Sequence, residues 1–399
     1  MKNRSFRFLW ISQVLANAGD IFYIVGLISI LYSLTESPLV LALVPFINMV
    51  GRFVSGLFSP LLINRYPLKQ LLVYSQAFKT VALGVLSVIT FVLAPVVPVV
   101  LAFVLVIAFL DGWAAPASQA MLPRLVPSHE LVKANSFFSI VYETVNLGGW
   151  ALGGLLVAFL GGQLVIVLTF GCYVAATILL MNIVDATDFK RKDSSVRRCD
   201  ELTEGWKIIW RHRLYRSLHI LIAFEAIANV VWIASILYVF VTEVLGQSEA
   251  WWGYINTAFF VGMLLGGILF SRFAASAEKR LRPILLISSF GICIITFLFG
   301  FTQIGWLSLV IVCFSGIFQQ LKGIATETLL QQNATSEELP KIFAAQSTIV
   351  SLLFAIGSLV FGLLAELWDV RITYFLAGVL LLIASTHIYR QRRHLPVKK

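Results

Sequence analysis

The sequence contains few of the residues on which soluble enzymes and metalloproteins depend. Of its 399 residues only 13% are charged, four are cysteines and five are histidines. A soluble domain carries about 25% charged residues, so the composition excludes an ordinary cytosolic enzyme, a disordered chain and a fibrous repeat. No cysteine or histidine spacing resembles a metal site, and no cysteine pair favours a disulfide. We therefore expect neither a bound metal nor a cofactor.

Motifs for energy coupling and catalysis are also missing. No glycine-rich loop ends in Gly-Lys-Ser or Gly-Lys-Thr, which argues against an ATP-driven pump. No cluster of histidine, cysteine and aspartate has catalytic spacing, and no stretch is long and polar enough for a soluble signalling domain. We therefore expect the protein not to be an enzyme. A membrane-embedded enzyme or a receptor is the alternative from another class.

Apolar residues, in contrast, are abundant. They make up 59% of the chain, and the mean hydropathy is +0.89. A helix needs about 20 apolar residues to cross about 30 Å of hydrocarbon, so the chain has room for about a dozen crossings. The sequence predicts an all-α membrane protein with twelve transmembrane helices. The predicted spans lie near residues 8–32, 39–62, 71–94, 99–121, 134–160, 163–183, 217–242, 252–273, 284–302, 305–328, 342–365 and 371–389.

Basic residues are unevenly divided between the two sides of this predicted bundle. Nearly all of the 30 lysines and arginines fall at the termini and in alternate loops, whereas the opposite side has only Arg371. The positive-inside rule then places both termini and the central loop in the cytoplasm. Topology thus accounts for the net charge of +10, and we expect contact with membrane lipid and none with nucleic acid. Tryptophans fall at the predicted external interface: Trp251, Trp252, Trp306 and Trp368.

One long polar stretch divides the spans into six and six. It covers residues 184–216, between a predicted N-terminal bundle over 1–183 and a C-terminal bundle over 217–399 with a basic tail. Within it, residues 206–213 predict an amphipathic helix on the membrane surface. The two halves share weak similarity, since Glu130-Leu131 matches Glu338-Leu339 and Lys133 matches Lys341. Such duplication is typical of transporters built from two repeats around a site at the membrane midplane.

Short motifs in and after the predicted first and fourth spans resemble those of a known family. They are Gly19-Asp20, Leu34-Thr35-Glu36-Ser37, Leu122-Pro123-Arg124-Leu125-Val126-Pro127, Glu130-Leu131 and Ala134-Asn135-Ser136. With them, the whole chain resembles the major facilitator superfamily, and within it the drug:proton antiporter branch that includes macrolide and multidrug efflux proteins. The resemblance implies two pseudo-symmetric six-helix bundles around a central cavity lined by the first, fourth, seventh and tenth spans.

Two superfamily motifs are present in altered form. The loop after the second span keeps Arg65 and Lys69, which match the family's gating loop, and has Asn64 where the family has an acid. The antiporter motif of the fifth span keeps its glycines and lacks its proline. Those glycines are Gly149, Gly153 and Gly154. The resemblance implies a gating role for the loop and an antiporter motif in the fifth helix.

Ionisable residues inside the predicted spans are the candidate functional groups, because each costs at least about 2.5–3.5 kcal/mol to insert. A carboxyl group in a poorly hydrated cavity favours its neutral form, so it can load a proton on one side and release it on the other. No histidine lies deep in a span, which leaves carboxylates as the proton carriers. The acids predicted to couple protons or bind substrate are Asp20, Asp111, Glu143, Glu225 and Glu327. The predicted counter-charges are Arg52, Lys79 and Lys322.

Structural roles are the alternative for several of these residues. Asp20 is a cavity or gate residue, or it forms a static pair with Arg52 or Lys79. Asp111 takes part in transport, or it too forms a static ion pair. Glu327 lies near the cytoplasmic end of its span, where a solvated carboxylate needs no special function.

Two of the acids share a helix face with an asparagine. Glu143 and Asn146 are three residues apart, and Glu225 and Asn229 are four apart, so each pair forms a polar stripe. Aromatic side chains are expected to join the acids in binding apolar cations. The candidate cavity aromatics are Trp113, Trp232 and Tyr142. Packing in the core or against lipid is the alternative for each of them.

The leading hypothesis is therefore a secondary transporter that exports hydrophobic or cationic drugs, such as macrolides, in exchange for protons by alternating access. The expected setting is a bacterial cell membrane, the expected partners are a small-molecule substrate and protons, and we expect a monomer that confers antibiotic resistance. The alternative is an exporter of a specific metabolite such as a siderophore, or an importer of the same fold. Fold alone does not identify the substrate.

Overall fold

The computed structural model describes residues 3–35, 38–92, 96–185, 198–232, 234–248 and 250–394. All regular secondary structure in these ranges is helical, and twelve helices are long and apolar enough to cross a membrane. The prediction of an all-α membrane protein with twelve transmembrane helices is confirmed. Helices prevail because the bilayer core offers no water to the backbone, so every amide and carbonyl must be satisfied within its own segment.

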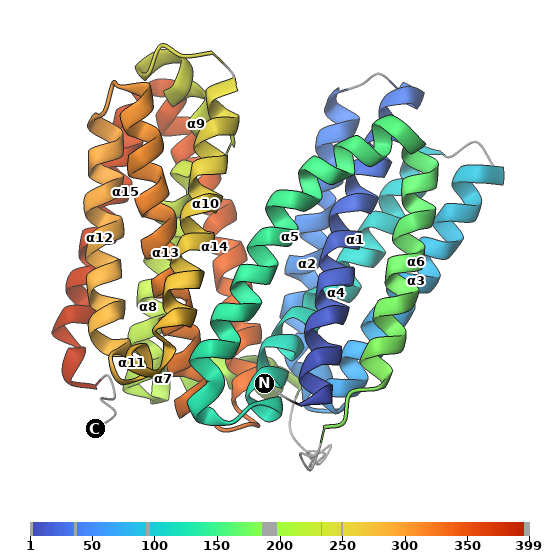
Figure 1. Cartoon of the computed structure of the whole chain (residues 1–399), viewed down its shortest axis with the longest axis horizontal. Helices are drawn as coiled ribbons and strands as arrows, with labels where there is room; N and C mark the ends of the chain where they lie inside the picture. Colours follow the sequence, from blue (N-terminus) through green and yellow to red (C-terminus); the bar gives the residue numbers. More distant parts are fainter. Residues whose placement is uncertain are drawn as a thin grey trace. The chain divides into compact units, whose positions relative to one another are not determined.

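The first half of the chain supplies six long helices (Figure 1). They are α1 (Arg4–Thr35), α2 (Pro38–Ile63), α3 (Leu68–Val92), α4 (Val97–Leu125), α5 (Leu131–Leu160) and α6 (Gly162–Met181), with the short η1 (Ser128–Glu130) before α5. Helix α7 (Arg198–Arg211) follows in the central loop. It contains most of the amphipathic helix predicted over 206–213, but begins earlier and ends before His212, which has an extended backbone.

The second half of the chain combines long helices with short α-helical, 3₁₀ and π-helical segments. They are α8 (Arg213–Ala228), η2 (Asn229–Trp232), α9 (Ala234–Val239), η3 (Phe240–Val244), α10 (Ala250–Arg272), α11 (Ala274–Lys279), α12 (Leu281–Phe301), α13 (Gly305–Asn333), α14 (Leu339–Leu367), α15 (Val370–Arg390) and η4 (Arg392–His394). Apart from the seventh, the predicted spans match the observed helices to within a few residues.

The chain folds into two compact units, each discontinuous in sequence. Unit 1 comprises Met1–Pro127, Thr144–Trp206 and Thr335–Thr348, and unit 2 comprises Ser128–Glu143, Lys207–Ala334 and Ile349–Lys399. In unit 1, α1 packs on α6, α4 packs on α2 and α3, and α3 also contacts α6. In unit 2, α13 packs on α10 and α12, and α15 packs on α12 and α8.

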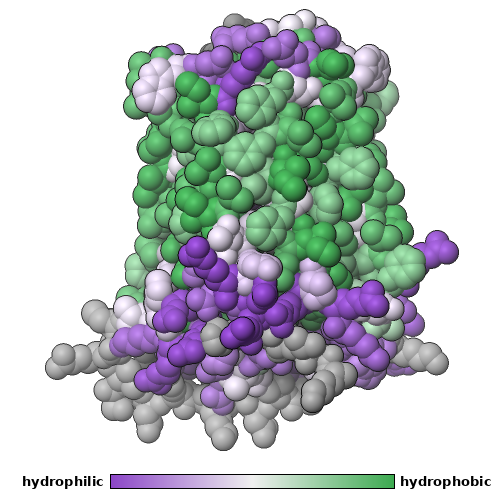
Figure 2. All heavy atoms as spheres, turned by 90° about the vertical axis from the view of Figure 1, so that its left-hand side faces the viewer, coloured by the Kyte–Doolittle hydropathy of each residue, from purple (hydrophilic) through white to green (hydrophobic). Residues whose placement is uncertain are grey.

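Many apolar side chains of these helices are exposed. Figure 2 shows one face on which a broad hydrophobic band lies between two hydrophilic margins. Among the exposed side chains are Ile287, Ile294 and Leu298 of α12 and Leu382 and Ile383 of α15. In water such a continuous apolar surface would drive aggregation, so the band fits a lipid environment.

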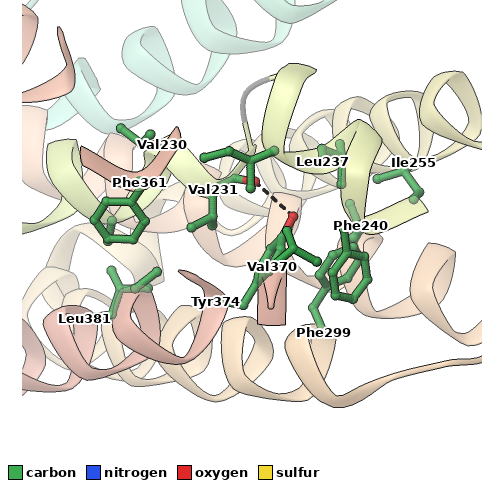
Figure 3. Close-up of a cluster of buried hydrophobic side chains, with 14 of the residues drawn as sticks. Val230, Val231, Leu237, Phe240, Ile255, Phe299, Phe361, Val370, Tyr374 and Leu381 are labelled. Carbon is green, nitrogen blue, oxygen red and sulfur yellow. Dashed lines mark hydrogen bonds between the residues drawn. The ribbon is translucent and has the colours of Figure 1, made fainter. Parts of the chain in front are cut away.

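The seventh predicted span is not one regular helix. Residues 217–242 were expected to form a single helix, but α8 gives way to the 3₁₀ turn η2, then to α9 and to the π-helix η3. The hydroxyl of the buried Tyr374 on α15 donates a hydrogen bond to the carbonyl oxygen of Val231, at 2.9 Å (Figure 3). A mid-helix 3₁₀ segment departs from the regular α-helical hydrogen-bond pattern, and the tyrosine satisfies one buried carbonyl there.

Candidate functional site

Four of the embedded charges meet in unit 1. The ammonium of Lys79 on α3 lies 2.9 Å from Asp20 Oδ1 on α1 and 2.8 Å from Asp111 Oδ1 on α4. The Lys79 side chain is 1% exposed, so both hydrogen bonds form almost out of contact with solvent. Charge-assisted bonds of this kind are short and strong. One lysine therefore ties together three helices that are far apart in sequence.

Arg52 on α2 completes the group, which we call the unit 1 charge quartet (Asp20, Arg52, Lys79 and Asp111). Its guanidinium lies 2.7 Å from Asp111 Oδ2 and 3.9 Å from Asp20 Oδ2. Its side chain is 45% exposed, whereas those of Asp20 and Asp111 are 13% and 17% exposed. The quartet contains two acids and two bases, so it is formally neutral. Asp20 and Asp111 thus form the ion pairs that the sequence analysis named as the alternative to a transport role.

Glycines bring α2 and α4 close together at the quartet. A Cβ atom on Gly112, the neighbour of Asp111, would lie 2.4 Å from Ser55 Cβ and 2.8 Å from the carbonyl oxygen of Arg52. A Cβ on Gly51, the neighbour of Arg52, would lie 2.8 Å from Ala108 Cβ. Any larger residue would force the backbones apart. The two glycines therefore hold Arg52 within reach of Asp111.

Tyr173 on α6 is a quartet neighbour that the sequence analysis did not identify. Its hydroxyl donates a hydrogen bond to Asp20, and its ring centroid lies 5.0 Å from Lys79 Nζ, within the range of a cation–π contact. The side chain is fully buried. A signal was available, because a phenol in an otherwise apolar span needs a hydrogen-bond partner. The sequence could not say which residue that partner is.

Unit 2 contains a second ion pair. Lys322 Nζ on α13 lies 2.8 Å from Glu225 Oε1 on α8, with side chains 4% and 10% exposed. Lys322 also donates a hydrogen bond to Gln319 Oε1 one turn away, at 3.0 Å. The sequence named both residues but did not pair them. This pair is also formally neutral.

Two of the predicted acids have no such cation. Within the part of the chain that the structure describes, neither Glu143 on α5 nor Glu327 on α13 has a basic side chain within ion-pair distance. Glu143 is 7% exposed, so its carboxyl is nearly removed from solvent. Glu327 accepts one long hydrogen bond, 3.4 Å, from Gln331 Nε2 on the next turn. Among the residues described, these two acids therefore differ from the other three in having no counter-charge.

Asn135 connects Glu327 to the start of α5. Its amide donates hydrogen bonds to Gln331 Oε1 at 2.7 Å and to Thr328 Oγ1 at 2.9 Å, and all three side chains are buried. Gln331 in turn donates to Glu327. The sequence singled out Asn135 only as part of a family motif. In the structure the side-chain amide of Asn135 orients the side-chain amide of Gln331, which in turn contacts the carboxylate of Glu327.

The predicted gating loop contacts an acid of α7. Asn64 donates a hydrogen bond from Nδ2 to Glu204 Oε2 on α7 at 3.3 Å, and Glu204 Oε1 lies 3.0 Å from Lys341 Nζ on α14. Asn64 and Lys341 are each 7% exposed. A Cβ on Gly205 would lie 2.4 Å from the carbonyl oxygen of Lys341, so α7 and α14 pack without space between them. Of the other loop residues, Arg65 is exposed and Lys69 is half-buried.

The Glu204 contact leads to a stability prediction. Replacing Glu204 by alanine leaves two buried donors, Lys341 and Asn64, without this acceptor. We expect the free energy of unfolding to fall by about 1–3 kcal/mol, measured by denaturant unfolding in detergent. Glu337→Ala is the matched control, because Glu337 is exposed. Equal stability of the two variants would contradict the prediction.

The predicted glycine motif of α5 is only partly at a helix contact. A Cβ on Gly149 would lie 2.8 Å from Ile21 Cδ1, and one on Gly153 would lie 3.3 Å from Val25 Cγ2, both on α1. Gly154 has open space around it. The first two glycines therefore favour close packing of α5 on α1.

The three predicted cavity aromatics lie in different surroundings. Trp113 packs edge-on against Phe109, at 5.2 Å between ring centroids, and its buried indole N–H has no hydrogen-bond partner among the residues described. Trp232 packs against Phe299 and Tyr374 in the hydrophobic cluster of unit 2. Tyr142 is 51% exposed. The sequence alone could not predict which of these three aromatic side chains packs in the interior and which is exposed.

Known proteins with similar sequences place the chain in a family. The model of the transmembrane secretion effector family, a branch of the major facilitator superfamily (MFS), matches residues 1–398. The chain belongs to this MFS family. It is 29% identical over 385 residues to the MFS-type transporter YfmI of Bacillus subtilis, covering 95% of this chain and 94% of that one. It is 21% identical over 380 residues to macrolide efflux protein A of Streptococcus pyogenes, covering 94% and 92%.

Solved structures of MFS transporters have the same fold as this MFS protein. A bacterial homologue of the iron transporter ferroportin, in an outward-facing state, gives a TM-score of 0.77 at 15% identity and covers 97% of this chain and 98% of that one. The E. coli fucose:proton symporter gives a TM-score of 0.70 at 15% identity, with coverage of 98% and 97%. The chain is thus a multi-pass membrane protein with an MFS transporter fold, and transporters of this family handle small-molecule substrates.

Proposed function

We propose that this MFS protein exports hydrophobic or cationic drugs, such as macrolides, from a bacterial cell in exchange for protons. One observation carries the proposal. The embedded bases are matched by acids, with Arg52 and Lys79 in the neutral quartet and Lys322 on Glu225. Glu143 and Glu327 are left over as acids without a basic partner in the described chain. The similarity to macrolide efflux protein A supports the substrate class.

The chemistry of a leftover acid suits proton exchange. An ionised carboxylate without a counter-charge is costly in a membrane interior, so it is best accommodated there when it holds a proton or a cationic ligand. In an alternating-access cycle it binds a proton when its cavity is open outward and gives it up when a cationic drug enters from inside. Proton and drug then compete for one carboxylate, which is the basis of exchange.

The unit 1 charge quartet and the Glu225–Lys322 pair have a structural role in this proposal. A carboxylate held by a buried lysine already has its counter-charge, so gaining a proton or binding another cation there disrupts its charge-assisted hydrogen bond to that lysine. We assign the quartet and the Glu225–Lys322 pair to holding the helices of each unit together. The gating loop, anchored through Asn64 and Glu204, then stabilises one end of unit 1. Both termini lie in the cytoplasm in this scheme.

Reconstituted vesicles test the proposal directly. The protein is placed in liposomes with an imposed inward proton gradient, and internal pH is followed when macrolides and lipophilic dyes are added. We expect substrate-triggered proton movement with several compounds. No movement with any compound, in vesicles shown to contain folded protein, contradicts drug–proton exchange and favours a narrow metabolite carrier.

A further inference from the structure

A pocket of about 320 Å³ lies between the end of α12 and the beginning of α15. It is lined by Phe297, Gly300, Phe301, Arg371, Ile372 and Phe375. Its volume is at the lower end of the range of small-molecule pockets. Phe297 and Phe375 meet edge-on across it, with 5.6 Å between ring centroids. Five of the six lining residues are thus apolar, and the charge of the pocket comes from one arginine.

Arg371 lacks an ion-pair partner in this pocket. Its Nε atom is buried and has no hydrogen-bond partner among the residues that the structure describes. The nearby carboxylate of Asp369 is engaged by the backbone: its Oδ1 accepts a hydrogen bond from the amide N–H of Arg371 at 2.8 Å. A buried guanidinium nitrogen without an acceptor is costly. The site therefore has an unmet preference for an anion.

The rings that line the pocket are exposed, near the ends of two membrane-spanning helices. Phe301 is 70% exposed and Phe375 is 50% exposed, so the rings that line it also form the outer surface of the protein. Trp306, at the beginning of α13, and Trp368, just before α15, are both well exposed. Tryptophans gather at the level of lipid headgroups. Arg371 is also the single basic residue on the side that the charge distribution predicts to be external.

We propose that this pocket binds an anionic phospholipid, with the lipid phosphate on the guanidinium of Arg371 and the adjoining part of an acyl chain among the phenylalanines. Planar guanidinium groups bind phosphate oxygens through paired, charge-assisted hydrogen bonds. A free inorganic anion would satisfy the arginine but leave the apolar walls unfilled. A phospholipid fills both parts, and the surrounding bilayer supplies it. The inference is independent of the transported substrate.

Native mass spectrometry of the purified, delipidated protein tests the site, with phosphatidylglycerol as the titrated probe. We expect one phosphatidylglycerol to bind with higher affinity than the rest, and R371Q to weaken it about tenfold, the effect of losing a charge-assisted contact. Ile372→Trp narrows the pocket, keeps the arginine and should also weaken binding. R390Q is the matched control, since Arg390 is an exposed arginine at the opposite end of α15.

Each outcome supports or overturns the proposal. Size-exclusion profiles first establish that each variant is folded, and Ile372→Trp serves as the test if R371Q is not. Binding to R371Q that equals wild type overturns the proposal, and so does an equal loss in R390Q. Equal binding of phosphatidylcholine shows that the headgroup charge is not recognised, which overturns the choice of an anionic lipid. Displacement by glycerol phosphate at similar concentration identifies a simple anion site instead.

Discussion

Lys79→Met is expected to reduce the stability of the protein by about 3–5 kcal/mol, the usual cost of removing one partner of a buried ion pair. The lysine is 1% exposed and hydrogen-bonded to both Asp20 and Asp111. Without it, two carboxylates share a single, half-exposed cation, Arg52. Because the neutral methionine cannot satisfy either acid, α1, α3 and α4 lose the ionic contact that they share through this lysine. Thermal unfolding in detergent and the yield of monodisperse protein measure the effect.

A second substitution tests whether unbalanced charge causes this loss of stability. Lys79→Met combined with Asp20→Asn again has one acid and one base in the group, Asp111 and Arg52, which are 2.7 Å apart. We expect the double variant to be more stable than Lys79→Met alone. A double variant that is no more stable than Lys79→Met would contradict the argument that unbalanced charge causes the loss. Lys69→Met, a half-buried position in the first turn of α3, should change little.

Glu143→Gln should abolish proton-driven efflux while leaving folding and drug binding measurable. The amide has nearly the shape of the carboxyl but cannot exchange a proton. Because Glu143 has no basic partner in the described part of the chain, the substitution leaves no cation unpaired. Its effect on stability should therefore be small, unlike that of Lys79→Met. Drug-triggered pH change in proteoliposomes and drug binding in detergent provide the two measurements.

The controls decide between the two unpaired acids. Glu366→Gln replaces an exposed acid at the end of α14 and should transport as wild type does. Full active transport by Glu143→Gln removes this residue from the mechanism. Loss of transport in Glu327→Gln would then assign the proton to Glu327, whose carboxyl is contacted by Gln331. Transport retained by both single variants and their combination would contradict the proposed coupling.

Sequence and structure agree best where one physical effect dominates. The twelve spans could be predicted because about 20 apolar residues per crossing are required wherever a helix meets lipid. The break after Ala228 could not, since Val230 and Val231 suit an apolar helix and Asn229 alone is a weak stop signal. One of its contacts comes from Tyr374, 143 residues away, whose hydroxyl donates a hydrogen bond to the carbonyl oxygen of Val231. Aromatic packing with Phe240 and Phe299 stabilises the same region.

The residues of the candidate site could likewise be predicted only in part. The sequence by itself determined which ionisable groups lie within the membrane, because the hydropathy of the surrounding residues fixes their depth. It did not determine their partners. Lys79 meets acids 59 and 32 residues away, and Asn64 meets Glu204 across 140 residues. Such pairings depend on the rotation and crossing of whole helices, which packing between distant segments sets. Only the tertiary structure therefore decided which charges are matched, and that Glu143 and Glu327 lack a basic partner in the described chain.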